Sequence, residues 1–317
     1  MSRGVRLTGR RIIVTGAASG LGAAAFRMLR ESGSRVVGID IQQAEDVLLA
    51  DVTEPAQVRL SVARAADSLG GVDVLVNAAG IGWAHSAGRE PGEDVRRIFE
   101  VNFFGPWNTT ASALPWLLEA HGHVINVASG IAVLAMPFGA AYSASKRALT
   151  AYSDVLRLEY GPRLAVTAFF PGYLDTPIHS RNLEQGYTVG NVIPQDSLHG
   201  AARALVRACR TRPRNASSSV RTDLVMRAGR IWPGPLERAM RARLLKDMAT
   251  RPLPDFLAAD PALGIPYASG FVTFDLNRQN AAATGPSGDG AAQSWVSVVH
   301  QTGSHNAASP AFLMSAP

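Results

Sequence analysis

The sequence predicts an α/β protein built on a doubly wound parallel sheet of about seven strands, with helices on both faces and a C-terminal extension. Short runs of apolar, often β-branched residues alternate along the chain with longer helix-like segments. Most of these runs are apolar at consecutive positions, which is typical of strands buried between two helical layers. A glycine-rich turn also follows the first run and leads into a helical segment.

The elements follow in a regular order. We expect strands at 11–15, 35–39, 47–50, 72–76, 123–127 and 164–170, with a weaker strand at 219–226. Helical segments fall between them, at 21–32, 55–69, 93–120, 140–160 and 198–210. Gly33 is a suitable end for the first helix. Pro106 and Pro115 should bend or break the long segment 93–120, because a proline lacks the backbone N–H that an inner helical turn needs.

The composition places a domain boundary near residue 250. Residues 1–250 carry the alternating pattern of the main domain. Residues 251–317 change in character, and from 281 onward they are rich in Ala, Gly, Ser, Asn and Pro with little periodicity. Such a composition buries little apolar surface, so we expect this extension to be poorly ordered.

Cysteine usage and hydropathy point to a soluble cytoplasmic protein. Cys209 is the only cysteine, which excludes an intrachain disulfide and fits a reducing compartment. No secretory signal is apparent, and no apolar run approaches the roughly 18 residues of a membrane-spanning helix. The seven histidines show no metal-ligand spacing, so no metal site is expected.

The turn after the first strand is a candidate phosphate-binding loop. Its glycines have the spacing G-x3-G-x-G, and the residues we assign to cofactor binding are Gly16, Ser19, Gly20, Leu21 and Gly22. Glycines let the backbone approach a pyrophosphate closely, and the following helix presents its N-terminal N–H groups to the phosphates. By itself this pattern is weak, because any tight strand-to-helix turn can carry it.

The ends of the next three strands support a dinucleotide site. Asp40 ends the second strand, 18 residues beyond Gly22, where a carboxylate can accept hydrogen bonds from ribose hydroxyls. A 2′-phosphate there would meet like charge, and neither 17–21 nor 41–43 holds a basic residue. We therefore expect NAD rather than NADP. The adenosine would also border the ends of strands three and four, at Asp51, Val52, Asn77, Ala78, Ala79 and Gly80.

Tyr142 and Lys146 are the main candidates for chemistry. They lie four residues apart at the start of the helix 140–160, so they share one face. A cation beside a phenol favours the phenolate and lowers the pKa of the tyrosine toward the working range. An amphipathic tyrosine and a solvated lysine would give the same bare pattern.

Together these motifs resemble the short-chain dehydrogenase/reductase family, in its single-domain branch. The matching segments cover residues 8–176, with weaker similarity to about 245. In order they are TGAASGLG at 15–22, Asp40, Asp51 with Val52, NAAG at 77–80, Asn102 in VNFFG, Ser129 in NVASG, YSASK at 142–146 and PGYLDT at 171–176. The family usually has a second Asn where this chain has Ala78.

The resemblance implies catalytic roles. Tyr142 would pass a proton to or from the substrate oxygen and would also contact the cofactor, and Ser129 would polarise the substrate oxygen. Lys146 would lower the pKa of the tyrosine and bind the nicotinamide ribose, while Asn102 would hold a water that links Lys146 to solvent. The nicotinamide would be bordered by Pro171, Gly172 and Thr176.

The resemblance also implies an architecture and an assembly. The sheet would be a Rossmann sheet with strand order 3-2-1-4-5-6-7. The family commonly forms homodimers or homotetramers, and the long helical segments 93–120 and 140–160 would form the interface. An extension beyond the last strand is unusual in the family, so the geometry of this assembly stays open.

The substrate region is apolar. Family members read substrate with the loop after strand five and the segment after strand six, here 131–138 and 173–194. The first is almost wholly apolar, and no basic residue lies between 130 and 141 to bind a carboxylate or phosphate. We expect a hydrophobic secondary alcohol or ketone. Alternatively, these residues pack the core and His179 or Arg181 recognises a polar substrate.

The positive charge of the chain is concentrated near its end. The window 201–250 holds twelve basic and three acidic residues, a net charge of +9, against +6 for the whole chain. Within 235–248, Leu236, Met240, Leu244 and Met248 recur every four residues, with arginines around them. We expect a core-docked helix with a solvated basic face. A peripheral contact with an anionic membrane is the alternative, and no aromatic interleaving supports nucleic-acid binding.

The sequence therefore predicts reversible, NAD-dependent oxidation of a hydrophobic secondary alcohol to a ketone. An NADPH-dependent carbonyl reductase is the alternative enzyme. A non-catalytic NAD-binding protein and a membrane-surface protein are alternatives of another class.

Overall fold

The structure is a computed structural model that describes residues 4–134, 136–180, 184 and 195–250. Some predictions concern residues that the structure does not describe. They are those for the extension 251–317, for Arg181 and for most of the predicted substrate-reading segment 173–194. All the described residues belong to one unit of the chain.

A seven-stranded sheet forms the centre of the fold, in the predicted order β3-β2-β1-β4-β5-β6-β7. Every neighbouring pair is parallel. The strands are β1 (Arg11–Thr15), β2 (Arg35–Asp40), β3 (Val47–Leu49), β4 (Val74–Asn77), β5 (His123–Val127), β6 (Ala165–Phe170) and β7 (Asn215–Ser217). The order reverses between β1 and β4, and ligands of open α/β sheets bind at the carboxyl edge beside such a reversal.

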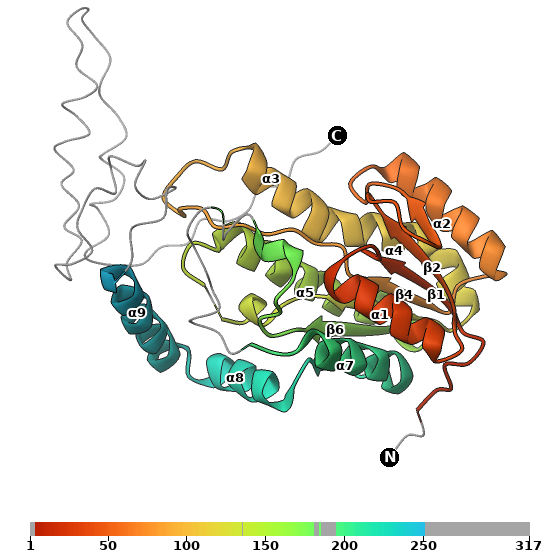
Figure 1. The fold of residues 1–317 in the computed structure, drawn as a ribbon. Helices are drawn as coiled ribbons and strands as arrows, with labels where there is room; N and C mark the ends of the chain where they lie inside the picture. The colour runs from red at the N-terminus through yellow and green to blue at the C-terminus, as the bar shows by residue number, and fades with distance from the viewer. Residues whose placement is uncertain (1–3, 135, 181–183, 185–194, 251–317) are drawn as a thin grey trace, which may run out of the picture. The chain divides into compact units, whose positions relative to one another are not determined.

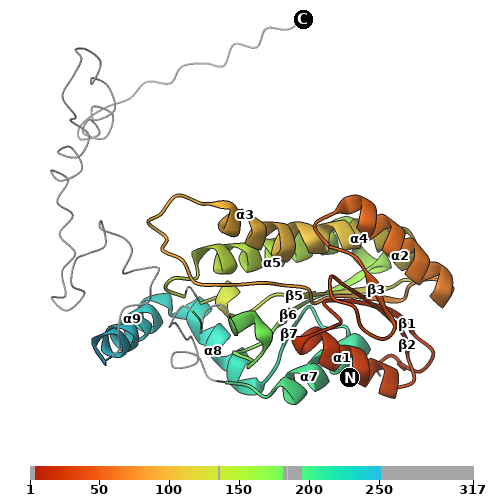
Figure 2. The same ribbon diagram turned by 45° about the horizontal axis from the view of Figure 1, so that its top comes forward.

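Helices cover both faces of the sheet (Figure 1, Figure 2). The first five are α1 (Gly20–Glu31), α2 (Pro55–Leu69), α3 (Glu93–Phe99), α4 (Gly105–Glu119) and α5 (Ala140–Tyr160). The last three described are α7 (Leu198–Thr211), α8 (Val220–Ile231) and α9 (Pro233–Thr250). Figure 2 shows α2, α4 and α5 on one face of the sheet and α1 with α7 on the other.

Two hydrophobic clusters account for the sandwich of layers. One joins Phe26 and Leu29 of α1 and Leu205 of α7 to the sheet, and the other joins Val62 of α2 and Leu117 of α4 to its opposite face. Because the central strands are buried on both sides, they read as continuous apolar runs, which is why the sequence located six of them.

The segment 93–120 is helical throughout, but its middle is irregular. A π-helical turn, Glu100–Phe104, separates α3 from α4. Pro106 lies in the first turn of α4, where its missing N–H removes no bond from the helix interior, whereas Pro115 lies inside it. The two prolines therefore do not break the segment. The irregular turn ends two residues before Pro106, and π turns of this kind are frequent at functional sites.

The prediction of a strand at 219–226 is wrong. The last strand, β7, is shorter and comes earlier, and Val220–Ile231 is a helix. Ser219 caps this helix, since its side-chain oxygen accepts a hydrogen bond from the N–H of Thr222 at 3.1 Å. Its buried positions, Met226 and Gly229, are three residues apart, a helical spacing rather than the alternation of a half-buried strand.

Helix α9 confirms the helix expected over 235–248. Met240 packs against a small apolar cluster around Met136 and Phe138, in the loop between β5 and α5. Side chains from 243 onward lie outside the described residues. Among the helices that the structure describes, none is long and apolar enough to cross a membrane.

Candidate active site

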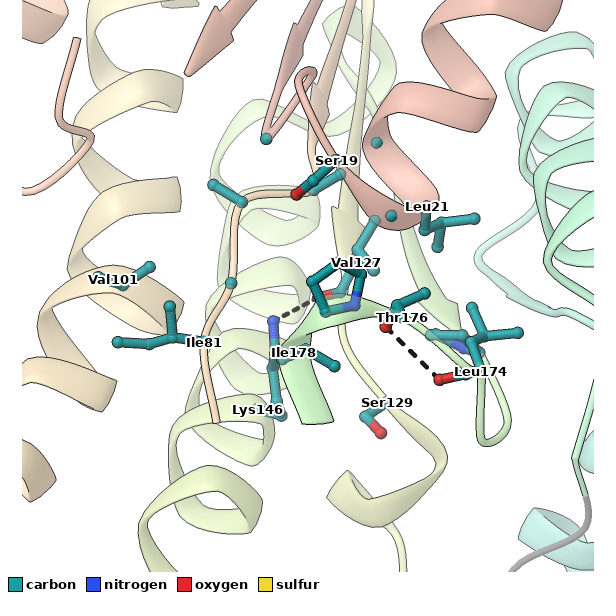
Figure 3. Close-up of a pocket in the computed structure, with 18 of the residues that line it drawn as sticks. Ser19, Leu21, Ile81, Val101, Val127, Ser129, Lys146, Leu174, Thr176 and Ile178 are labelled. Carbon is teal, nitrogen blue, oxygen red and sulfur yellow. Dashed lines mark hydrogen bonds between the residues drawn. The ribbon is translucent and has the colours of Figure 1, made fainter. Parts of the chain in front are cut away.

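A cavity of about 530 Å³ opens along the carboxyl ends of the strands. Figure 3 shows part of its lining, with Ser19 and Leu21 near one end and Ser129 near the other. Most of the residues predicted for the site line it: Gly16, Ser19, Gly20, Leu21, Gly22, Asp40, Asp51, Val52, Ala78, Ala79, Gly80, Ser129, Tyr142, Lys146, Pro171, Gly172 and Thr176.

The glycine turn is packed too closely for side chains. Gly16 has φ +69°, and a Cβ on it would lie 2.7 Å from the backbone nitrogen of Ala79. A Cβ on Gly22 would lie 2.0 Å from the carbonyl oxygen of Gly16. The hydroxyl of Thr15 accepts N–H bonds from Ala78 and Ala79 at 3.1 and 3.2 Å, which ties the loops after β1 and β4 together. The N-terminus of α1 is thereby fixed at the cavity wall.

Asp40 presents a carboxylate of fixed orientation at the end of β2. One oxygen accepts a hydrogen bond from the N–H of Ala18 at 2.9 Å, and the other accepts one from the N–H of Gln42 at 2.9 Å. The side chain is buried in the cavity wall. The two backbone bonds hold the acid where a ribose hydroxyl could reach it.

The sequence analysis did not identify one cationic side chain in the cavity wall. Arg97 comes from α3, and its guanidinium donates to Asp51 at 2.6 Å and to the hydroxyl of Thr53 at 2.8 Å. Burial alone would raise the pKa of Asp51, but the hydrogen bonds from Thr53 and Arg97 outweigh it and leave that pKa lowered. The arginine is therefore paired with an ionised acid.

Lys146 is almost completely buried, with 3% of its surface exposed. Its ammonium donates to the carbonyl oxygen of Val127 at 2.9 Å (Figure 3) and lies 5.8 Å from the centre of the Tyr142 ring. Burial lowers the pKa of Lys146 to about 8, because a low-dielectric environment disfavours the charged form. Its protonation therefore changes near physiological pH.

Tyr142 and Ser129 come together at the same end of the cavity. Burial raises the pKa of Tyr142, and a side-chain hydrogen bond with Ser129 partly opposes that shift. The net direction is upward, contrary to the expectation that Lys146 lowers it, because desolvation of the phenolate outweighs the other contributions. Ser129 caps the short turn Gly130–Ala132, and its oxygen accepts the N–H of Ile131 at 3.3 Å.

Asn102 lies behind the cavity wall rather than in it. It is fully buried in the π-helical turn, accepts the N–H of Ile81 at 2.9 Å and donates to the Ile81 carbonyl at 2.8 Å. A Cβ on Gly80 would lie 3.2 Å from the Asn102 side-chain oxygen and 3.3 Å from the ammonium of Lys146. Asn102 thus fixes the loop after β4 close to Lys146.

Asn77 is also placed away from the cavity. Its side chain is buried beneath the site, where it accepts the hydroxyl of Thr109 at 2.6 Å and donates to Asn126 at 2.8 Å. Asn126 in turn donates to Ser153 at 2.9 Å. This buried polar network joins β4 and β5 to α4 and α5, and it supports the floor of the site from below.

The loop after β6 is held by an acid that the sequence analysis did not single out. The N–H of Gly172 donates to the hydroxyl of Ser218 at 2.8 Å, and Ser218 donates to Asp196. The hydroxyl of Thr222 donates to the same carboxylate at 2.8 Å. A Cβ on Gly172 would lie 2.6 Å from Asp196. No spacing signals this contact, because the fold alone brings residues 172, 196 and 218 together.

The substrate side of the cavity is largely apolar. Of the described residues in 131–138, only Ile131 lines it, whereas Ala132 and Met136 are buried in packing clusters. The alternative that this loop packs the core is therefore right for part of it. The segment after β6 contributes the rest of the wall, with Tyr173, Leu174, Ile178 and His179. Burial lowers the pKa of His179, which favours the neutral ring.

Comparisons with known proteins agree with this geometry. A profile of the family described as short chain dehydrogenase matches residues 10–186. The 3-ketodihydrosphingosine reductase of Bacteroides thetaiotaomicron is 35% identical over 182 residues, which cover 55% of this chain and 68% of that protein. The dehydrogenase/reductase SDR family member 7B of Mus musculus is 31% identical over 186 residues, which cover 52% of this chain and 58% of that protein.

A solved structure is similar over about three quarters of this chain. It is a short chain dehydrogenase from Burkholderia cenocepacia in complex with NADP, with a TM-score of 0.64 and 28% identity. The match covers 76% of this chain and 100% of that one.

Proposed function

We propose that this chain, which belongs to the short-chain dehydrogenase/reductase family, is an NAD-dependent oxidoreductase that interconverts a hydrophobic secondary alcohol and its ketone. The observation that carries the proposal is the meeting of Ser129, Tyr142 and Lys146 at one end of a cavity whose other end is bordered by Asp40. A proton-transfer group and a candidate ribose-binding acid thereby share one elongated site.

The residues present fit a nicotinamide dinucleotide. The turn from Gly16 to Gly22 and the N-terminus of α1 would hold the pyrophosphate, and Asp40 would bind the adenosine ribose. Lys146 would bind the second ribose, and the loop that begins at Pro171 would border the nicotinamide. When bound, the dinucleotide supplies the hydride chemistry, and the protein supplies orientation and the proton.

Two features of the wall favour NAD over NADP. The Asp40 carboxylate would repel a 2′-phosphate at the ribose, and its orientation is fixed by two backbone N–H bonds. The guanidinium of Arg97 is already bonded to Asp51 and Thr53. The similar Burkholderia protein was solved with NADP, so the preference depends on these residues of this chain.

The catalytic residues divide the proton chemistry between them. With its pKa raised, Tyr142 holds its proton at neutral pH and is set to donate it to a carbonyl oxygen. In the oxidative direction Tyr142 must first lose that proton to solvent, and its phenolate then accepts the proton of the alcohol. The cationic form of Lys146 stabilises the phenolate that remains. Ser129 hydrogen-bonds with Tyr142 and would orient the substrate oxygen beside it.

The wall beyond the catalytic residues supports an apolar substrate. Ile131, Leu174 and Ile178 border the cavity on this side, and the ring of His179 lies against that of Tyr173 with centres 4.6 Å apart. The relative from Bacteroides is named for a keto compound and its reduction. We propose a hydrophobic carbinol or ketone as substrate.

Replacing Tyr142 by phenylalanine tests the mechanism. We expect turnover of 2-decanol or 1-phenylethanol with NAD to fall by about 10²–10⁴, the usual contribution of a positioned acid/base. NADH affinity should change far less than turnover, because phenylalanine keeps the ring in the cavity wall and removes only the hydroxyl. Tyr160→Phe, at the far end of α5, is the matched control. Undiminished turnover in Tyr142→Phe would refute the mechanism.

A further inference from the structure

The outer face of α8 exposes large apolar side chains. Val220, Leu224 and Ile231 are 87%, 67% and 65% exposed, and Trp232 directly after the helix is 65% exposed. The first three are spaced i, i+4 and i+11, which places them on one stripe of the helix. We call these four residues the α8 stripe.

The opposite face of α8 already completes the core. Met226 is buried against Phe170, Ala128 and Ala132, at the end of the sheet where the catalytic loop begins. Gly229 lies close to Leu134 and Leu236, since a Cβ on it would come within 2.1 and 3.3 Å of them. The helix is therefore apolar on two faces, and its inner face packs against the fold.

The surroundings of the α8 stripe are basic. The described side chains of 220–242 include five exposed arginines, at 221, 227, 230, 238 and 241, against two acids. One of those acids, Asp223, already binds Arg227 at 2.7 Å on the same helix. The net charge next to the stripe is thus positive, and it belongs to the most basic window of the chain.

The exposed apolar side chains and the basic charge around them together indicate which partner would bind this surface. A second copy docked through the same face would bring arginines against arginines, because a two-fold contact places one patch against itself. An anionic bilayer instead complements the charge and accepts the apolar side chains. Trp232 is suited to the headgroup level, where an amphipathic ring has both an apolar and a polar neighbourhood.

The position of α8 relates this surface to the loop after β5. Its inner face covers the loop after β5, and Figures 1 and 2 both show α8 and α9 together at the end of the molecule away from α2.

We propose that the α8 stripe and its arginines form a surface that docks this protein peripherally on an anionic lipid bilayer. The stripe inserts at the headgroup level, and the arginines bind anionic headgroups. Lipid binding by this surface does not require hydride transfer, so it can be tested separately from the proposed enzyme activity.

Vesicle sedimentation of the full chain tests the proposal. We expect the protein to sediment with vesicles of phosphatidylcholine and phosphatidylserine, and much less with phosphatidylcholine alone. Added salt should weaken binding, because it screens the arginines. Leu224→Ser and Trp232→Ser should each weaken binding by about tenfold, which corresponds to one buried apolar side chain. Arg221→Glu should weaken it by fivefold or more, since one charge near such a surface is worth about fivefold.

The matched control is Leu60→Ser, a 54%-exposed leucine on α2. It should bind vesicles like the unchanged protein. Fluorescence gives a second readout: anionic vesicles should shift the emission of the unchanged protein to the blue, and Trp232→Phe should remove most of that shift. NADH titration of each variant reports separately on the cofactor site, and it should be unchanged.

Three results would overturn the proposal. The first is no sedimentation with anionic vesicles. The second is equal sedimentation of the Leu224, Trp232 and Leu60 variants, which would place lipid binding elsewhere on the chain. The third is a change of oligomeric state in Leu224→Ser on size-exclusion chromatography, which would show that protein covers the α8 stripe.

Discussion

A buried lysine shapes both the chemistry and the stability of the site. Lys146 is 3% exposed, and burial lowers its pKa to about 8, below the ordinary value near 10.4. Between these two pH values the unfolded chain binds more protons than the folded one, so stability rises with pH through that window. At neutral pH the buried charge destabilises the fold, and the chain keeps it where the proposed chemistry needs a cation.

Replacing Lys146 by methionine should therefore separate stability from activity. At pH 7, without cofactor, we expect the free energy of unfolding to rise by about 1–3 kcal/mol, because an apolar side chain of similar length removes the buried charge. The gain should shrink as pH rises toward 10, where the lysine is neutral in both states. Thermal unfolding at several pH values measures this gain in stability. NAD-dependent turnover of the variant should fall. A melting temperature below that of the unchanged protein would contradict the account.

At the scale of elements, β5 and β6 are joined by a buried histidine. His123 is fully buried, and its Nε2 lies 2.8 Å from the hydroxyl of Thr167. Burial, aided by the charge of Arg212, lowers the pKa of His123 to about 3. In the unfolded chain the pKa of this histidine is near 6.5. Between pH 3 and 6.5 the unfolded chain therefore binds a proton here that the folded chain does not bind. The stability that depends on a neutral His123 is fully present above pH 6.5 and is lost as pH falls toward 3.

His123→Val should therefore make the fold less sensitive to acid. From pH 7 to pH 4, we expect the unchanged protein to lose roughly 3 kcal/mol more than the variant, from the 2.5 pH units below 6.5 at about 1.4 kcal/mol each. Urea unfolding at both pH values gives the two losses. His121→Asn changes an exposed histidine just before β5 and serves as control, since it should lose as much as the unchanged protein. Equal losses in His123→Val would refute the assignment.

The sequence predicted most elements because burial made their pattern clear. Six strands are apolar runs, and the order of the sheet followed from the family resemblance. The prediction of the seventh strand was wrong because β7 lies at the edge of the sheet and contains only Asn215–Ser217. None of its residues is fully buried, so no apolar run marks it in the sequence. Val220 and Leu224 then look like strand residues, although the Ser219 cap makes them the outer face of a helix.

The same reasoning separates the parts of the site. Residues at the ends of parallel strands meet at one edge whatever the details of packing, so Gly16, Asp40 and Ser129 could be placed from sequence. Arg97 and Asp196 could not, because their partners lie far along the chain and carry no motif. The direction of the Tyr142 pKa also depended on burial, which the residue spacing does not reveal.

At the scale of the whole molecule, a second apolar surface lies on α4, on α5 and on the π-helical turn that precedes α4. Phe104 and Trp107 are 43% and 45% exposed, and Val155 and Leu158 are 45% and 83% exposed. Trp107 stacks on Tyr152 with ring centres 4.7 Å apart, which joins the two helices. We propose this surface as the contact of a homodimer or homotetramer. These helices cover the face of the sheet opposite α7 (Figure 2).

Leu158→Arg should dissociate the assembly. A charge introduced within the proposed apolar contact would be buried without a partner, which destabilises association strongly. Size-exclusion chromatography with light scattering should show an oligomer for the unchanged protein and a monomer for the variant. Leu60→Arg on α2 is the control and should keep the oligomer. A monomeric unchanged protein would remove the basis of this assignment.

The central claim is that this cavity binds NAD(H) in a site set by Asp40. Parallel fluorescence titrations with NADH and NADPH test it most directly, with Asp40→Ala beside the unchanged protein. We predict that NADH binds at least tenfold more tightly than NADPH, and that Asp40→Ala narrows the ratio by admitting the 2′-phosphate. Equal or tighter binding of NADPH by the unchanged protein would contradict the claim, as would binding of neither.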